Sequence, residues 1–272
     1  MDDTSFLLTA VVALAAAGAI GGVISGLLGV GGGIVTVPVM FEIFGLLGID
    51  PDLRMHLAVG TSLATIIPTS ITSARAHAKR GAVDKDLMRK LGPPLFAGVI
   101  IGTLIAGPVK GQVLTAIFGI AALVVALYMA FRRDTWRLGE ELPHGIGLGL
   151  LGGSIGMVSV LMGIGGGTLG VPAMTLFNVP IRRAVGTASA LGLVVSLPGA
   201  IGFVIAGWGH PDLPPFSLGY VNVLASVILL STMLLTVPFG AKLAHSISQK
   251  ALRLAFAGFL AVVATRMLLS LV

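Results

Sequence analysis

The sequence predicts an all-α polytopic membrane protein made of two inverted five-segment repeats, with broken or short helices after glycine-rich motifs. Three observations predict this fold. Apolar residues make up 56% of the 272 residues and charged residues only 10%, whereas soluble domains average about 25% charged residues. Two stretches of 38 and 37 residues, 4–41 and 145–181, carry no charged side chain. A glycine-rich motif lies in the middle of each stretch. The composition excludes a soluble protein, because a soluble protein of this size could not bury so many apolar side chains.

Ten apolar segments follow one another along the chain, and a helix needs about 20 apolar residues to cross a bilayer. They span residues 6–28, 34–47, 56–78, 91–109, 112–131, 145–163, 168–178, 184–207, 217–239 and 251–270. The first follows two acids with no Lys or Arg before it, so we interpret it as a retained helix rather than a secretory signal. Segments 34–47 and 168–178 are too short to cross alone, and each follows a glycine break inside its uncharged stretch.

The positive charges predict the orientation. If every segment changes side, thirteen of the 17 Lys and Arg residues fall on one side of the membrane. The positive-inside rule makes that side cytoplasmic and places both termini outside the cytoplasm. If the two short segments did not change side, this bias would weaken. The basic pI of about 10.2 then follows from topology, and nucleic-acid binding loses its support.

An internal repeat relates the two uncharged stretches. Residues 18–38 (GAIGGVISGLLGVGGGIVTVP) and 152–172 (GGSIGMVSVLMGIGGGTLGVP) are identical at ten of 21 positions, and Ala-Val-Gly-Thr recurs at 58–61 and 184–187. We therefore expect a first repeat at 1–131, a cytoplasmic linker at 132–144 and a second repeat at 145–272. An odd number of segments per repeat inverts the halves, a common plan of secondary transporters.

The glycine breaks predict an anion site near mid-membrane. Non-helical backbone is tolerated at that depth only beside protein or a watery cavity. A helix that begins after such a break presents free N–H groups and a positive dipole end. The candidate substrate-binding residues are Gly31, Gly32, Gly33, Thr36, Thr61, Ser62, Gly165, Gly166, Gly167, Thr168, Thr187 and Ser189. Pro38 and Pro172 are expected to bend or end the short helices.

Close packing is the alternative reading for the glycines. Gly-x-x-x-Gly pairs such as Gly18/Gly22 and Gly152/Gly156 are typical helix–helix contacts, and the triple glycines could be a structural hairpin. Among charged side chains, Glu42 is a candidate for coupling because acids inside membrane segments are costly. Arg75 and His77 are candidates for gating or for attracting an anion, with interaction with lipid headgroups as the alternative.

The doubled G-[V/I]-G-G-G-x-x-x-V-P motif, the Ala-Val-Gly-Thr that follows and the basic loops resemble the sulfite exporter TauE/SafE family over nearly the whole chain. The resemblance implies a permease of the bacterial inner membrane that exports sulfite or a small organosulfonate. In that membrane, the charge argument above makes both termini periplasmic. The glycine breaks agree with an anion but do not by themselves indicate sulfur.

The preferred function is a secondary transporter of a small anion. A passive anion channel is the runner-up, and an intramembrane enzyme or scaffold is third. No hydrolase, zinc-protease or nucleotide-binding motif is present in the sequence, which has no cysteine. We expect no enzyme activity, no cofactor and no metal. The expected partners are the anion, the lipid bilayer and protons as a candidate coupling ion, with a homo-oligomer left open.

Overall fold

The computed structural model describes residues 3–28, 33–131, 137–244 and 249–271. In chain order these form α1 (Asp3–Leu28), α2 (Gly33–Leu46), α3 (Pro51–Lys79), α4 (Lys85–Ala106), α5 (Gly111–Phe131), α6 (Ile146–Leu161), α7 (Gly166–Leu176), α8 (Ile181–Ala206), β1 (Ser217–Leu218), β2 (Val221–Asn222), α9 (Val223–Ala244) and α10 (Gln249–Leu269). Within the described residues, five helices are long and apolar enough to cross a membrane. The predicted all-α polytopic membrane fold is confirmed.

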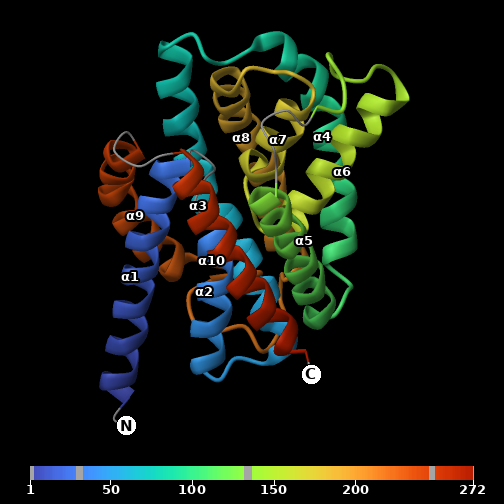
Figure 1. Ribbon diagram of the computed structural model, residues 1–272. Helices are drawn as coiled ribbons and strands as arrows, with labels where there is room; N and C mark the ends of the chain where they lie inside the picture. The colour runs from blue at the N-terminus through green and yellow to red at the C-terminus, as the bar shows by residue number, and fades with distance from the viewer. Residues whose placement is uncertain (1–2, 29–32, 132–136, 245–248, 272) are drawn as a thin grey trace.

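The two short helices start inside the bundle and run in opposite directions. α2 has 14 residues and α7 has 11, so at 1.5 Å per residue they are about 21 and 16 Å long. A hydrocarbon core about 30 Å thick exceeds both lengths. Figure 1 shows that α2 runs to the end of the bundle where α1 begins and α10 ends, and α7 runs to the other end.

The connections divide between two ends of the bundle. Figure 1 places the α3–α4 connection, the segment before α6 and the α7–α8 connection at one end. We call this the basic end, because it carries Lys79, Arg80, Lys85, Arg89, Lys90, Arg137, Arg182 and Arg183. The α2–α3, α4–α5 and α8–α9 connections lie at the opposite end. This division agrees with segments that alternate in direction. The assignment of the basic end to the cytoplasm remains a prediction.

The two sequence halves interpack rather than stand apart. α1 packs against α9, α4 against α6, α3 against α8 and α5 against α10. When α1–α5 are matched in order to α6–α10, the pair α1–α9 exchanges with α6–α4, and the other two pairs map onto themselves. This pattern is what a two-fold relation between the halves would produce, while the inversion relative to the membrane remains a prediction.

The paired glycines make the expected helix–helix contacts. A Cβ on Gly22 of α1 would lie 2.6 Å from the carbonyl oxygen of Met233 in α9. A Cβ on Gly156 of α6 would overlap the carbonyl oxygen of Leu95 in α4. The two equivalent helices therefore use the same small-residue motif to approach their partners.

Capping explains why two helices begin earlier than their apolar segments. α3 begins at Pro51 rather than residue 56, because an Asp50 carboxylate oxygen accepts from the Asp52 N–H at 2.8 Å. α4 begins at Lys85 rather than residue 91, because Asp84 accepts from the N–H groups of Asp86 and Leu87. Side-chain acceptors of this kind satisfy free helix donors even in polar sequence.

The predicted helix 217–239 was wrong over its first six residues. Residues 217–222 form an antiparallel hairpin in which Ser217 pairs with Asn222 and Leu218 with Val221. Gly219 takes a φ of +54° in its turn, a conformation that favours glycine. α9 then starts at Val223, because the Asn222 side-chain oxygen accepts from the Ala225 N–H at 2.9 Å.

The proline expectation needs one correction. Pro38 lies inside α2 and Pro172 inside α7, so neither ends its helix. Pro38 is the sixth of the 14 residues of α2, and Pro172 is the seventh of the 11 residues of α7. Each proline lacks the N–H that would bond to the carbonyl four residues earlier, so each helix gives up one intrahelical hydrogen bond and continues.

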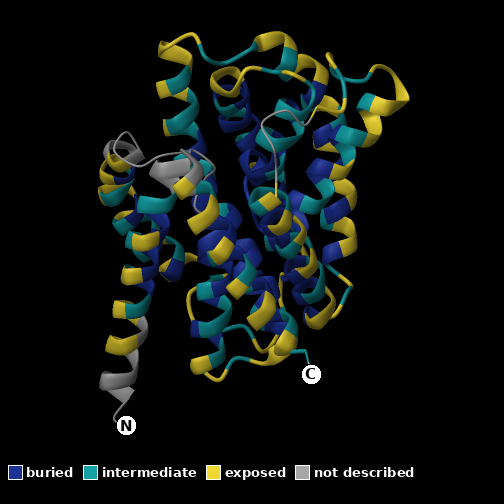
Figure 2. Ribbon diagram, viewed as in Figure 1, coloured by how far each residue is buried: buried dark blue, intermediate teal, exposed yellow. Residues whose placement is uncertain are grey.

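Burial separates an interior from a lipid-facing surface. Figure 2 shows buried residues gathered along the inner helices and exposed residues on the outside. Large exposed apolar side chains include Leu8 on α1, Ile101 on α4, Val124 on α5 and Leu235 on α9. An outer surface of this composition fits hydrocarbon rather than water.

Candidate functional site

The break between α6 and α7 forms the centre of the candidate site. Gly163 has a φ of +64°, and a Cβ there would lie 2.8 Å from the Val59 Cα on α3. α7 then begins at Gly166 after Gly165, whose position has no side-chain cap. The first N–H groups of an uncapped helix lack intrahelical acceptors, so this end can accept a negative group.

The start of α2 meets this break. A Cβ on Gly33 would lie 2.7 Å from the Gly163 carbonyl oxygen and 3.1 Å from the Ile164 Cα. The Ser62 hydroxyl on α3 donates to the same Gly163 oxygen at 2.7 Å. The first repeat therefore contacts the glycine break of the second repeat directly. Gly31 and Gly32 lie outside the described residues.

Two hydroxyls tie α2 to α3 at this point. Thr36 Oγ1 lies 2.9 Å from Ser62 Oγ, and it donates to the Gly33 carbonyl oxygen at 3.2 Å. Both side chains are 0% exposed. Two hydroxyl protons serve three close contacts here, so these contacts cannot all be made at once.

Three other buried hydroxyls have no hydrogen-bond partner within the part of the chain that the structure describes: Ser159, Thr168 and Ser196. Thr168 lies in the first turn of α7 and is 3% exposed. Buried polar groups are nearly always paired with protein, water or ligand. An unpaired hydroxyl beside free helix N–H groups suits a bound oxyanion.

α8 lies against the start of α7. A Cβ on Gly166 would lie 3.3 Å from the Leu191 carbonyl carbon, and one on Gly192 would lie 2.6 Å from Ser70 Oγ. Gly167 is buried in the first turn of the same helix. Gly166 therefore allows α7 to approach α8 closely, and Gly192 does the same for α8 and α3. The packing alternative for Gly166 holds beside the substrate reading.

The two Ala-Val-Gly-Thr motifs make reciprocal contacts away from this cluster. Thr61 Oγ1 accepts from the Asn222 N–H at 2.9 Å, and Thr187 Oγ1 accepts from the Asp84 N–H at 3.0 Å. A Cβ on the preceding glycine, Gly60 or Gly186, would overlap the carbonyl oxygen two residues before that donor. Each motif thus holds the segment that caps a helix of the other half.

Ser189 also lies outside the central cluster. Its hydroxyl donates to the Val185 carbonyl oxygen at 2.9 Å and accepts from Ser73 Oγ at 3.1 Å. Of the predicted site residues that the structure describes, Gly33, Thr36, Ser62 and Gly165–Thr168 share the break region. Thr61, Thr187 and Ser189 have protein partners elsewhere.

We expect Thr61→Val and Thr187→Val to lower stability more than substrate affinity. Valine removes the acceptor, and a buried N–H without a partner costs about 1–3 kcal/mol. The larger loss is expected in Thr61→Val, because its partner Asn222 is buried. Thermal unfolding in detergent, compared with Thr265→Val on exposed α10 surface, measures the effect. Unchanged unfolding with weakened substrate binding would instead make these hydroxyls ligands.

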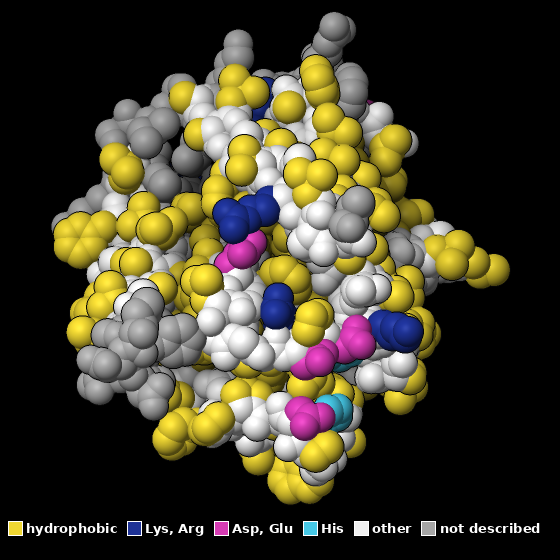
Figure 3. All heavy atoms as spheres, turned by 90° about the horizontal axis from the view of Figure 1, so that it is seen from below, with side chains coloured by type: hydrophobic (Ala, Val, Ile, Leu, Met, Phe, Trp, Pro, Cys, Tyr) yellow, Lys and Arg dark blue, Asp and Glu magenta, His cyan; other side chains and the backbone are white. Residues whose placement is uncertain are grey.

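Three charged candidates lie on the surface. Glu42 forms an ion pair with Arg266, with Nε 2.7 Å from one carboxylate oxygen, and it accepts a hydrogen bond from Nη2 at 3.1 Å. This contact joins α2 to α10. Figure 3 shows the end of the bundle opposite the basic end, where few charged side chains lie among many apolar ones. Arg75 is exposed on α3, and His77 lines a surface pocket with Arg80 and Arg182.

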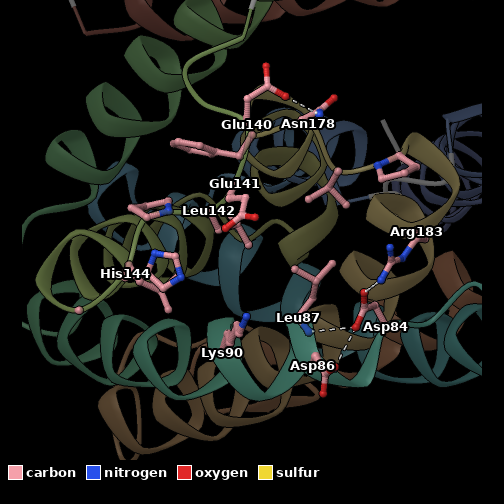
Figure 4. Close-up of a pocket in the computed structure, with 16 residues that line it drawn as sticks. Asp84, Asp86, Leu87, Lys90, Glu140, Glu141, Leu142, His144, Asn178 and Arg183 are labelled. Carbon is pink, nitrogen blue, oxygen red and sulfur yellow. Dashed lines mark hydrogen bonds and ion pairs between the residues drawn. The ribbon is translucent and has the colours of Figure 1, made fainter.

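A groove of about 490 Å³ opens at the basic end between α4, the segment before α6 and the start of α8. Figure 4 shows Arg183 paired with Asp84 and Glu140 bonded to Asn178 along its walls. Burial of Asp84 opposes its ionisation, but N–H donors from Leu87 and Asp86 and the Arg183 guanidinium outweigh it and lower the pKa of that carboxyl. The Asp84 carboxylate therefore stays ionised and fastens α4 to α8.

Four residues that lie in or near the candidate site, or hold its surroundings in place, were not predicted from the sequence. Ser159 and Ser196 occupy positions equivalent to Ser25 and Ser70 in the first repeat. A hydroxyl kept in both copies of an apolar repeat was the signal that could have found them. Asp84 and Asn222 carried only a capping signal.

Comparison with known proteins agrees with this architecture. Residues 14–267 match the family described as Sulfite exporter TauE/SafE. A probable membrane transporter protein of Haemophilus influenzae is 33% identical over 254 residues, covering 93% of this chain and 96% of the relative. One of Methanocaldococcus jannaschii is 29% identical and covers 93% of each chain, and one of Bacillus subtilis is 28% identical over 72% of this chain and 79% of its own. No solved structure matches.

Proposed function

The chain belongs to the sulfite exporter TauE/SafE family, and from this premise we propose that it carries a small oxyanion, such as sulfite or an organosulfonate, by alternating access. Its relatives are named membrane transporters, and the chain is a multi-pass membrane transporter. That membership agrees with the expectation that the protein is not an enzyme.

One observation carries the proposal of an anion. The Thr168 hydroxyl, which has no partner in the described part of the chain, lies in the first turn of α7, whose start has no side-chain cap. Backbone N–H groups and a hydroxyl at a helix N-terminus attract negative oxygens. The described residues of this cluster, Gly33, Thr36, Ser62 and Gly165–Thr168, carry no charge, so a weakly bound anion can also leave.

The proposed mechanism uses the two reciprocal contacts. The contact of Thr61 with Asn222 would close the access path at the end of the bundle where the hairpin 217–222 lies. The contact of Thr187 with Asp84 would close the path at the basic end. Because Ser62, Thr36 and Thr168 are 0–3% exposed, the described conformation is closed around the cluster. Opening one contact at a time would admit the anion from one side only. Two inverted repeats, 1–131 and 145–272, joined by 132–144, would make the two openings alike.

A transport assay in proteoliposomes tests this function. We expect sulfite or an organosulfonate to enter saturably from a panel of sulfite, sulfate, sulfoacetate, taurine and acetate. The flux should depend on an imposed gradient. Single-channel conductance without saturation would establish the passive anion channel instead, and no flux of any anion would refute the proposed substrate class.

We further propose that the membrane is the bacterial inner membrane and that the basic end faces the cytoplasm. The basic residues of the α3–α4 and α7–α8 connections support this orientation. A reporter that works only in the periplasm should then be active when it is fused after Val272. A reporter that works only in the cytoplasm should be active when it is inserted at 137–144. The reverse pattern would invert the proposed orientation.

A further inference from the structure

His56 is a buried histidine that the proposed transport path does not use. It lies in the second turn of α3, at the end of the bundle opposite the basic end, and is 3% exposed. Its Nδ1 lies 2.9 Å from the Asp52 carbonyl oxygen, and its Nε2 lies 3.0 Å from the Ala106 carbonyl oxygen. Both ring nitrogens therefore face oxygens that can only accept.

This geometry selects one protonation form. A neutral imidazole carries one N–H and one lone pair, whereas the imidazolium carries two N–H groups. Only the doubly protonated ring can donate to both carbonyl oxygens. In the neutral ring, one nitrogen lone pair would face a carbonyl lone pair at hydrogen-bond distance.

Burial of the ring opposes its charge, but two features of the surroundings favour a positive ring. Ala106 is the last residue of α4, and the C-terminal end of a helix attracts cations. The Tyr220 ring lies 4.8 Å from the imidazole, between ring centroids. An aromatic ring within about 6 Å attracts a cation that lies over its face. The Phe203 ring, at 6.4 Å, lies just outside that range.

The ionisable neighbours come from three segments. α3 carries Asp52 and Arg54, and the Arg54 Nε donates to the Ile49 carbonyl oxygen. Lys110 lies in the α4–α5 connection. The α8–α9 connection contributes Tyr220, whose pKa is raised by burial so that its phenol stays neutral, and His210, whose ring lies 6.2 Å from that of Tyr220. Among the described residues, the His56 ring bonds to two backbone carbonyl oxygens and to no carboxylate.

We propose that His56 is a proton-binding site, whose doubly protonated ring joins the start of α3 to the end of α4 beneath Tyr220. Loss of one proton breaks one of the two carbonyl bonds and loosens this end of the bundle. The hairpin 217–222 is held to the same stretch of α3 by Thr61, one residue before Ser62. As a coupling site for transport, this assignment rests on the proposed function. As a proton site, it does not.

Nuclear magnetic resonance of the full chain in lipid nanodiscs, with ¹⁵N-labelled histidine rings, tests the site directly. The chain has five histidines, and the spectrum of His56→Gln identifies the His56 signals. We expect two ring N–H protons on His56 that exchange slowly with water, unlike those of exposed histidines. A single ring N–H at every pH between about 5 and 8, the range in which histidines titrate, would overturn the proposal.

Cysteine labelling tests the linked movement, since the chain has no cysteine of its own. Val221→Cys places a thiol in the hairpin at a position that is 6% exposed. We expect its maleimide labelling, corrected for thiol ionisation with a free-cysteine standard, to rise with pH by up to about tenfold per pH unit, the limit for one proton. His56→Gln should abolish the rise, and His210→Gln, the matched control, should keep it.

A pH-dependent rise that persists in His56→Gln would refute the linkage. Labelling needs no substrate, so the two proposals fail separately. Proton-linked labelling without flux of any tested anion would refute the proposed substrate and leave the proton site standing. Anion flux with a singly protonated His56 would do the reverse.

Discussion

Replacing Gly33 with valine is expected to abolish transport while the chain still inserts into the membrane. Even the Cβ would lie 2.7 Å from the Gly163 carbonyl oxygen and 2.8 Å from the Ile66 Cδ1. Two further methyl groups cannot fit unless α2 moves off the break before α7. That movement would separate Thr36 from Ser62 and deform the proposed site, because packed interiors do not absorb such volume.

The matched control is Gly258→Val, a helical glycine in α10 with open space where its Cβ would lie. Sulfite uptake by proteoliposomes containing equal amounts of inserted protein measures both variants. Gly33→Ala should retain part of the uptake, since it adds only the Cβ. Wild-type uptake by Gly33→Val would show that the contact between α2 and the second glycine break does not matter for transport.

Replacing Thr168 with valine is expected to weaken sulfite binding without lowering stability. A hydrogen bond to a charged group contributes about 1.5–3 kcal/mol, so the affinity should fall by roughly 10- to 150-fold. Valine keeps the shape of threonine. It also removes a buried hydroxyl that has no partner among the described residues, so the free energy of unfolding should be unchanged or higher.

Thr175→Val is the control on the same helix, because the Thr175 hydroxyl donates to the Pro172 carbonyl oxygen at 2.9 Å within α7. The half-saturation concentration of uptake and the unfolding temperature should be measured for both. The substrate role of Thr168 would be ruled out by unchanged half-saturation, or by an equal loss in Thr175→Val.

The Gly166→Val substitution distinguishes a packing role from a binding role less clearly than Thr168→Val does. The Cβ would lie 3.3 Å from the Leu191 carbonyl carbon, a tight contact that a small shift of α8 can relieve. Loss of uptake in this variant would therefore report on both helix packing and the free N–H groups at the start of α7.

Apolar length and charge placement determined the fold class and the helix order from the sequence. A run of about 20 apolar residues is long enough to cross the hydrocarbon core as a helix, and a helix satisfies its own backbone groups there. The repeated glycine motif also predicted which helices are broken, since consecutive glycines weaken helical structure wherever they lie. Helix starts at Pro51 and Lys85 were missed because their capping carboxylates lie in polar sequence. The hairpin 217–222 was missed because four strand residues have no periodic signal.

The residues of the candidate site were partly predictable. Gly33, Gly165–Gly167 and Thr168 were predicted as site residues because they stand in a repeated motif at a helix start, and their role in binding stays a prediction. The partners of the hydroxyls were not. Thr61 and Thr187 stand in the repeated Ala-Val-Gly-Thr motif, where a pair of substrate ligands would also be expected. Only the fold shows that each accepts from a backbone N–H of the other half.

The sequence by itself determined that this protein is a polytopic bundle of apolar helices with two glycine breaks, because those properties depend on residues close together in the chain. The tertiary structure alone decided that Gly33 and Ser62 meet Gly163, and that His56 faces two carbonyl oxygens. Ser62 and Gly163 are 101 residues apart. Hydrogen bonds are directional and short, so their partners depend on how the helices pack, which no local pattern of residues specifies.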